Sequence, residues 1–359
     1  MNETNMNRLP VPTWNQCGVN AAPKAAALPE LSGDWGDANF AVTLPAGVGE
    51  SEEEFTSFTE SGMGAEADAF LLENAAVRHA LTVAENVTVA EPAVFEFTLD
   101  AAHPGTMSVL DVDAKANSSL TLVQVLRGDA ENGAAANLVR IRAAEGAHVR
   151  LVQIQMLGSR ARRWDAVAVE EGTGAKVEQV RVELGGSVSA CGTRAVLDHA
   201  KAEYDLDAVY FGSRNAVLDY NDVSVHTAKD TLCEMHTAGV LTGSASKILR
   251  GTIDFRRGAK RGVGHESEDV LLFSPAARNR TAPLILCGEE EVEGQHAASI
   301  GRLDEEKLYY LRSRGLSEAQ ARRLMVDARF APALDKIPLE ALREEVRAEA
   351  ARRLDEDAE

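Results

Sequence analysis

The sequence predicts a mainly β protein, whose core is a right-handed parallel β-helix with a small N-terminal segment and a C-terminal α-helical subdomain. Three observations lead to this prediction. From about residue 81 to residue 280, short alternating segments are separated by glycine, asparagine and aspartate, a pattern typical of strands and turns. Within this stretch a motif recurs. After about residue 302 the pattern becomes helical.

The recurring motif is the most informative of these observations. Asn117–Val125 lines up with Gly146–Ile154 and with Gly174–Val182, and a fainter copy begins at His199, so the copies start 29, 28 and 25 residues apart. A repeat of strand and turn cannot bury its own apolar face, and stacked neighbours cover it. A β-sandwich also has short strands, but it does not explain the recurring Gly-Ala-x-Val phase. The sequence therefore favours a solenoid.

We expect three parts: an N-terminal segment (1–80) that is mixed and partly helical, the β-helix core (81–301), and the helical subdomain (302–359). Near the N-terminus, Pro10, Pro12 and Trp14 form a rigid apolar entry segment. Ala21–Leu28 is expected to form a short helix.

Three helices are expected in the C-terminal subdomain. The first contains Leu308 and Leu311 on one face and ends at Gly315. Ser317–Gln320 has the form of a capping box that opens the second helix, and Pro338 starts the third. These helices cannot bury much surface among themselves, so they must pack on the β core, on a partner, or on both.

Composition and charge exclude several functions. With 37 basic and 56 acidic residues among 359, the formal net charge is −19, which disfavours nucleic acid and anionic membrane surfaces as partners. No apolar run of about 18 residues is present, and no leader is evident. The four cysteines, far apart in sequence, do not suggest a disulfide framework, and we expect a cytoplasmic protein.

Three stretches of the chain resemble the SufB/SufD family. The first is Leu9–Trp14, with Val19-Asn20 shortly after it. The second runs from Gly239 through Gly251–Phe255 to Leu272. The third is Cys287–Gly301, which continues into Leu308–Ser317. The three occur in the family's order and cover most of the chain. The length and the Cys-Gly-Glu-Glu form look like the short members of minimal systems.

The resemblance implies a scaffold subunit of the SUF iron–sulfur cluster assembly complex that is not itself an enzyme. Such a subunit would work with the ATPase SufC, take sulfur from a cysteine desulfurase, and carry a transient iron–sulfur cluster. It would pair with itself or with a second SufB/SufD chain. The sequence contains no Gly-x-x-x-x-Gly-Lys-Ser/Thr motif, which fits a partner that supplies the nucleotide chemistry. The resemblance further implies that SufC binds the C-terminal helices, where the candidate residues are Leu308, Tyr309, Tyr310, Leu311, Arg314 and Gly315.

The resemblance implies that Cys287 and His296 are the leading candidates for handling sulfur and iron. A thiolate takes up sulfane sulfur or ligates iron, and a neutral imidazole also ligates iron. The alternatives are a small buried thiol and a hydrogen-bonded interface histidine. The family's glutamate after this histidine is replaced by Ala297, so Glu290 and Glu293 are possible substitutes; the alternative is that they form a solvated acidic turn. On a strand, however, Glu293 shares a face with Gln295 and not with His296.

Other residues give weaker signals. Cys233 and His236 form a Cys-x-x-His pair that could hold a metal, although no second pair accompanies it. Lys247 and Arg250 could line a polar route for sulfur, but surface charge is the preferred interpretation. A basic cluster at Arg256–Arg261 could steer an acidic partner, or it could balance the neighbouring carboxylates, Glu266, Glu268 and Asp269.

Two other functions are compatible with a β-helix of this sequence. A β-helix enzyme that acts on polysaccharide would need clustered carboxylates and aromatic platforms on one face. No paired-carboxylate motif is evident and only 5% of the residues are aromatic. A mononuclear metal-binding protein would use the Cys-x-x-His pair.

Overall fold

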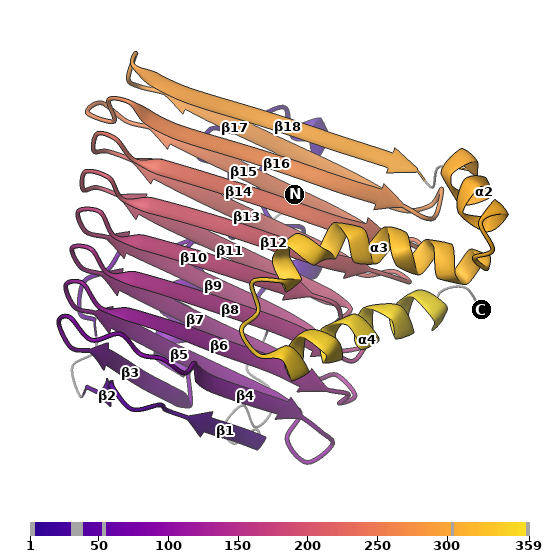
Figure 1. Ribbon diagram of the computed structural model, residues 1–359, viewed down its shortest axis with the longest axis horizontal. Helices are drawn as coiled ribbons and strands as arrows, with labels where there is room; N and C mark the ends of the chain where they lie inside the picture. Colours follow the sequence, from indigo (N-terminus) through magenta and orange to yellow (C-terminus); the bar gives the residue numbers. More distant parts are fainter. Residues whose placement is uncertain (1–3, 30–38, 52–54, 303–304, 357–359) are drawn as a thin grey trace.

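The computed structural model describes residues 4–29, 39–51, 55–302 and 305–356 of the chain. Its body is a parallel β-solenoid made of two facing sheets (Figure 1). The chain alternates between the sheets, so strands that are neighbours in one sheet belong to successive coils. The predicted β-helix core is therefore confirmed.

We call the sheet that carries the C-terminal helices the front sheet and the other the back sheet. The front sheet consists, in spatial order, of β1 (Asn39–Thr43), β4 (Ala93–Leu99), β6 (Ser119–Gly128), β8 (His148–Leu157), β10 (Lys176–Glu183), β12 (Glu203–Gly212), β14 (Leu232–Leu241), β16 (Gly262–Leu272) and β18 (Val292–Arg302). The back sheet consists of β17 (Arg278–Cys287), β15 (Ser246–Phe255), β13 (Val217–His226), β11 (Val188–Leu197), β9 (Arg162–Glu171), β7 (Ala134–Ala143), β5 (Gly105–Ala114), β3 (Val77–Val83) and β2 (Val48–Glu50). β1 and β2 pair antiparallel with β4 and β3, and the other pairings described are parallel.

The turns that lead into the front sheet share one backbone conformation. Asn117, Gly146, Gly174 and Lys201 occupy equivalent positions, with φ of 54°, 65°, 62° and 61°. Glycine and asparagine adopt this left-handed conformation readily, whereas lysine does so rarely. The first three copies of the repeat align as predicted. The fourth begins two residues later than the predicted His199, because Lys201 conceals the turn position.

The space between the sheets is apolar along the edge where these turns lie and polar further along the strands. Val149, Val177 and Tyr204 belong to the apolar part. Beyond them, the buried Gln153 amide donates to the Gln124 side chain, with N···O 3.1 Å, and buried ion pairs such as Arg181 with Asp222 follow in later coils. Buried charges require such partners. The solenoid thus encloses a strip of buried polar groups that leads toward its C-terminal end.

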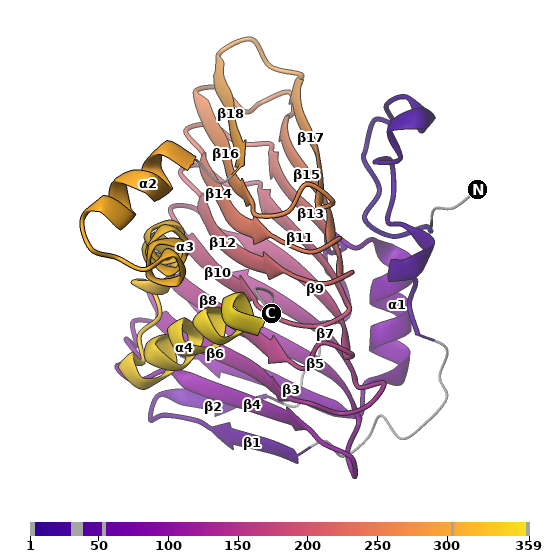
Figure 2. The same cartoon turned by 90° about the vertical axis from the view of Figure 1, so that its right-hand side faces the viewer.

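The N-terminal segment covers the outer surface of the back sheet (Figure 2). It contains the 3₁₀ helices η1 (Asn15–Cys17) and η2 (Lys24–Ala26) and the helix α1 (Ala65–Asn74). The buried Trp164 indole of β9 donates to the Ala26 carbonyl, with N···O 3.0 Å. The helix expected over 21–28 is only the three residues of η2, because Pro23 and the contacts with β9 hold an irregular backbone.

The C-terminal helices are α2 (Glu305–Ser313), α3 (Glu318–Leu334) and α4 (Glu340–Glu356). Helices α3 and α4 lie across the front sheet, where Phe330 and Val346 pack in one cluster with Val152 and Val180 (Figure 1). The predicted capping box at the start of α3 is confirmed, with Ser317–Gln320 hydrogen-bonded in both directions. No helix in the described ranges is long and apolar enough to cross a membrane.

Candidate functional site

The solenoid ends at its last coil, formed by β17 and β18, with no further coil stacked on it among the described residues. We call this surface the open end (Figure 1). β17 is hydrogen-bonded in register only to β15, and β18 only to β16, within the described strands. Inward-facing side chains that would be buried in an internal coil are therefore accessible here. Ile300, which stacks on the fully buried Val270, is 52% exposed.

His296 projects inward at the open end. It stacks on Glu266 of β16, which in turn stacks on the buried Met235 of β14. The His296 Nδ1 atom lies 3.4 Å from Glu266 Oε2. Nδ1 and both carboxylate oxygens are buried and have no hydrogen-bond partner among the described atoms. These three atoms leave hydrogen-bonding capacity unused, which is unusual for buried polar groups.

The surroundings of Glu266 favour its neutral form. Burial is the main reason that the pKa of this carboxyl rises from 4.5 to about 8, and repulsion from Asp222 and Glu268 adds to the effect. The carboxylate rests on the backbone of Gly251, where an added Cβ would lie 1.8 Å from Glu266 Oε1. Gly251 therefore makes the room that this side chain occupies.

A buried charge pair lies beside this carboxylate. The Lys247 ammonium contacts Glu268 and lies 3.3 Å from Thr281 Oγ1, and the Thr281 hydroxyl donates to the other Glu268 oxygen at 2.5 Å. Lys247 and Glu268 have fully buried side chains. Burial lowers the pKa of Lys247, while the carboxylates oppose this shift. The preferred interpretation of Lys247 as a surface charge is wrong, because the alternation of β15 points it inward.

Cys287 also lies at the open end, but on the other sheet. It ends β17, stacks on the buried Phe255, and has an exposed side chain. Glu290 is exposed in the turn that joins β17 to β18. Glu293 faces outward as expected, where it accepts from Gln295 at 2.7 Å and approaches His265 at 3.5 Å. The structure thus brings Glu266, and not Glu293, next to His296.

The Cys-x-x-His pair does not form a site within β14. Cys233 is buried inside the solenoid, whereas His236 is exposed on the outer face, as residues three apart on a strand must be. Among the described residues, no three histidine, cysteine, aspartate or glutamate side chains converge as a metal site by themselves. Of the remaining cysteines, Cys191 is buried and Cys17 is exposed on η1.

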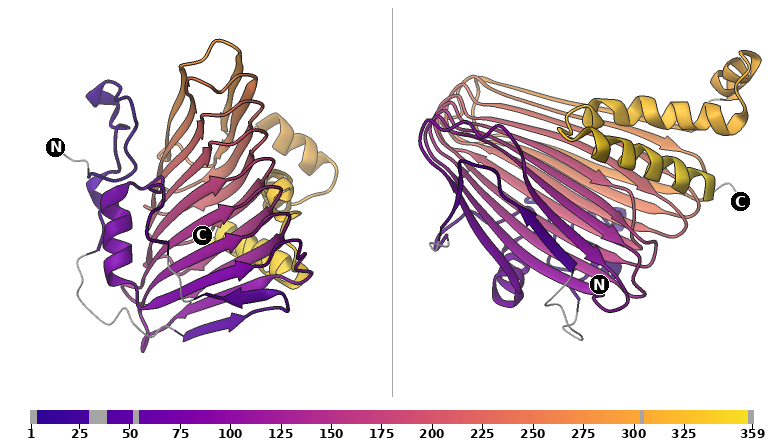
Figure 3. Two further views of the ribbon diagram at one scale, coloured as in Figure 1. Left: turned by 90° about the vertical axis from the view of Figure 1, so that its left-hand side faces the viewer. Right: turned by 60° about the horizontal axis from the view of Figure 1, so that its bottom comes forward.

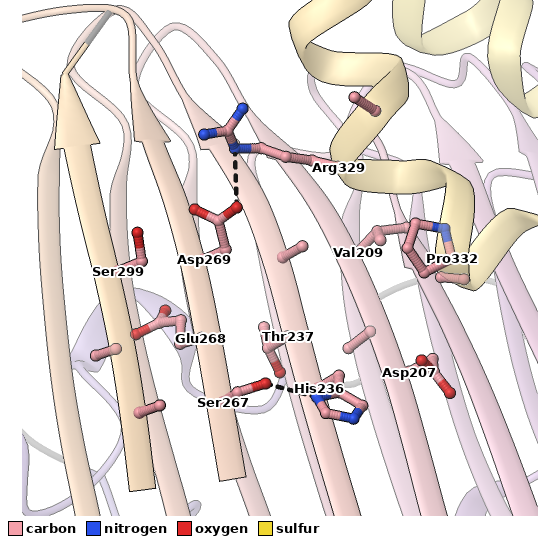
Figure 4. Close-up of a pocket in the computed structure, with 16 residues that line it drawn as sticks. Asp207, Val209, His236, Thr237, Ser267, Glu268, Asp269, Ser299, Arg329 and Pro332 are labelled. Atoms are coloured by element: carbon pink, nitrogen blue, oxygen red, sulfur yellow. Dashed lines mark hydrogen bonds and ion pairs between the residues drawn. The ribbon is translucent and has the colours of Figure 1, made fainter. Parts of the chain in front are cut away.

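A groove of about 750 Å³ lies outside the solenoid, between α3 and the strands of the front sheet (Figure 4). The Arg329 side chain of α3 bridges to Asp269 at 3.2 Å, and His236 is hydrogen-bonded to Ser267 at 2.5 Å. Ala297 and Ser299 of the last coil line the same groove, which therefore extends to the open end.

The candidate partner residues lie on or just beyond α2, which projects past the front sheet (Figure 3). Tyr309 is 76% exposed and Tyr310 is 56% exposed, while Leu308 is buried. Leu311 is half-buried, and Arg314 and Gly315 are exposed. This helix presents aromatic surface that the rest of the described chain does not cover.

The fold and the open end define a class of protein: a parallel β-solenoid whose polar interior emerges beside an exposed cysteine, with a helical tail on one face. Residues 97–329 match the family model "SUF system FeS cluster assembly, SufBD core domain". The chain belongs to the SufB/SufD family of iron–sulfur cluster assembly proteins.

Individual relatives agree with this assignment. The chain is 31% identical over 142 residues to the iron–sulfur cluster assembly protein SufD of Bacillus subtilis, covering 40% of this chain and 32% of that protein. It is 27% identical over 271 residues to a SufBD family protein of Pyrococcus horikoshii, covering 72% and 58%. A SufBD family protein of Staphylococcus epidermidis is 23% identical over 296 residues, covering 81% and 64%. The aligned regions span less than two thirds of each of these relatives.

Glu266 and Glu268 were not among the predicted site residues, and Lys247 was considered only for a polar sulfur route, with surface charge preferred. Balancing the basic cluster Arg256–Arg261 was one of two alternatives for these glutamates, but both are buried in the interior of the solenoid. The signal that could have identified Glu266 is the register: it occupies the position of His296 one coil earlier.

Proposed function

We propose that this chain is a scaffold subunit on which an iron–sulfur cluster is assembled, and that the open end is where iron and sulfur are received. The observation that carries the proposal is the pair His296 and Glu266, whose buried nitrogen and oxygen atoms are unpartnered at the accessible end of a family member's core. Imidazole nitrogen and carboxylate oxygen are suitable iron ligands.

The three groups have different roles in this proposal. The exposed Cys287 thiolate takes the sulfane sulfur of a persulfide donor, a cysteine desulfurase, as the donor's thiolate leaves. His296 and Glu266 hold iron, and the Lys247–Glu268 pair keeps the neighbouring charge balanced. Since two donors do not complete an iron site, the remaining ligands come from sulfur or from a partner chain.

The exposed surfaces support two partners in this proposal. The ATPase SufC docks on α2, where Tyr309 and Tyr310 supply uncovered aromatic area. A second copy of this chain covers the open end, because β17 and β18 are long edge strands with an exposed Ile300 beside them. ATP hydrolysis belongs to SufC, and this chain contributes binding rather than catalysis.

The test is co-expression with SufC, followed by anaerobic purification and reconstitution. His296→Ala and Glu266→Gln are compared with Glu293→Gln, a matched change on the outer face of the same coil. We expect every variant to retain SufC, the first two to lose most acid-labile sulfide and iron, and the control to match wild type. Cys287→Ser should reduce sulfur uptake from a persulfide donor. Full cluster content in the His296 and Glu266 variants would refute the assigned ligands, and failure of the wild type to bind SufC and form a cluster would refute the scaffold function.

A further inference from the structure

The apolar motif near the N-terminus forms a hook, Pro10–Gly18, that the proposed function leaves unexplained. Asn20 closes the hook at its base. Its side-chain oxygen accepts from the Thr13 backbone amide at 2.7 Å, and its side-chain nitrogen donates to the Thr13 carbonyl and to Asn15 Oδ1, each at 3.0 Å. These bonds give the hook a fixed shape.

The base of the hook is fastened to the last coils of the back sheet. Leu9 and Val19 pack against Ile248 of β15 and Ala282 of β17. The Arg280 guanidinium of β17 donates to the Gly18 carbonyl at 3.0 Å. The hook therefore holds its position relative to the coils that border the open end.

Arg250 of β15 strengthens this attachment. Its fully buried guanidinium donates to the carbonyls of Val19 at 2.5 Å and Ala21 at 2.6 Å, while Asp219 of β13 balances its charge at 2.9 Å. The preferred interpretation of Arg250 as a surface charge is therefore wrong. Because the buried Arg250 donates to two carbonyls of the N-terminal segment, that segment is held firmly against the solenoid.

The tip of the hook, in contrast, is uncovered. Trp14 is 80% exposed and Val11 is 48% exposed. A tryptophan held out on a fixed support loses little conformational entropy when it binds, which is the usual property of an interface anchor. The exposed side chains of Trp14 and Val11 make little contact with the rest of the chain, so they contribute little to its folding.

The position of the hook indicates which partner it contacts. Figure 2 shows it standing beside β13, β15 and β17, on the side of the back sheet opposite the C-terminal helices. A chain that covers the open end lies alongside this tip, whereas α2 and its partner lie on the other side of the solenoid. We propose that Trp14 and Val11 pack against the second copy of this chain, extending the contact made by the last coil. This inference rests on the proposed self-pairing.

Sedimentation velocity of the full chain over a range of concentrations tests the inference. Trp14→Ala is compared with wild type and with Leu324→Ala, which removes an apolar side chain of 48% exposure from α3 on the opposite face. We expect the dimer dissociation constant to rise at least about tenfold for Trp14→Ala and to stay unchanged for the control. Because Trp14 is exposed, its removal leaves the monomer folded.

A proximity measurement adds a direct readout. In a Cys287→Ser chain, Cys17 on the hook is the one exposed cysteine, because Cys191 and Cys233 are buried. A benzophenone maleimide on Cys17 should give a covalent dimer on irradiation, with a lower yield in Trp14→Ala. A dimer with the same dissociation constant in all three chains overturns the role of the hook and leaves self-pairing intact. A strictly monomeric wild type overturns both, and crosslinking to SufC alone assigns the hook to a different partner and refutes the proposal.

Discussion

Breaking the buried Lys247–Glu268 pair tests whether the interior near the open end is organised by charge. Both side chains are fully buried, and Glu268 also accepts from Thr281. Lys247→Met keeps the volume of the side chain but leaves Glu268 without its counter-charge. Removing one partner of a buried pair costs about 3–5 kcal/mol. Replacing both partners by Lys247→Met with Glu268→Gln leaves no uncompensated charge, so we expect a loss below about 2 kcal/mol.

The measurement is the free energy of unfolding from urea denaturation, monitored by far-ultraviolet circular dichroism. Equal losses in the single and double variants would refute the assignment of this contact as a charge pair.

Three further changes test other parts of the structure. Glu266→Gln should have the same free energy of unfolding as wild type near pH 4.5 and exceed it by at most about 5 kcal/mol above pH 8. The reason is that the folded pKa of about 8 lies above the ordinary 4.5, so wild-type stability falls as pH rises between these values. Urea unfolding at pH 4.5 and above pH 8 checks this, and a difference in stability that does not change with pH contradicts it. Gly251→Ala should destabilise the chain by about 1–3 kcal/mol, because the added Cβ displaces the Glu266 carboxylate. Gly301→Ala should not destabilise it, because nothing lies within 4 Å of the added Cβ. Thermal unfolding compares the two variants, and equal effects would refute the close contact between Gly251 and Glu266. Tyr309→Ser should leave the unfolding temperature unchanged and weaken SufC binding at least about tenfold by calorimetry, so unchanged binding would move the docking surface off α2.

The solenoid could be predicted because its local and repeating signals agree. The copies at Asn117, Gly146 and Gly174 combine alternation with a turn residue suited to positive φ, and the structure stacks them in that register. The copy at Lys201 was misplaced because lysine gives no sign of a left-handed turn. The register of this fourth copy is fixed by the strands that pair with it in space, and its own sequence does not show it.

The site was harder to predict because it depends on which residues stack. His296 was identified through a resemblance, and the outward orientation of Glu293 follows from simple alternation, as observed. The pairing with Glu266, 30 positions earlier, requires the coil length at that point, and no local pattern shows it. The inward placement of Lys247 likewise needed the phase of β15, since its neighbours include both polar and apolar residues.

Anomalous scattering at the iron absorption edge would locate iron directly in the reconstituted complex with SufC. We expect an iron peak at the open end, within bonding distance of His296 and Glu266, with sulfur density toward Cys287. A peak in the outer groove beside α3, or iron held without either residue, would contradict the assignment of the open end as the assembly site.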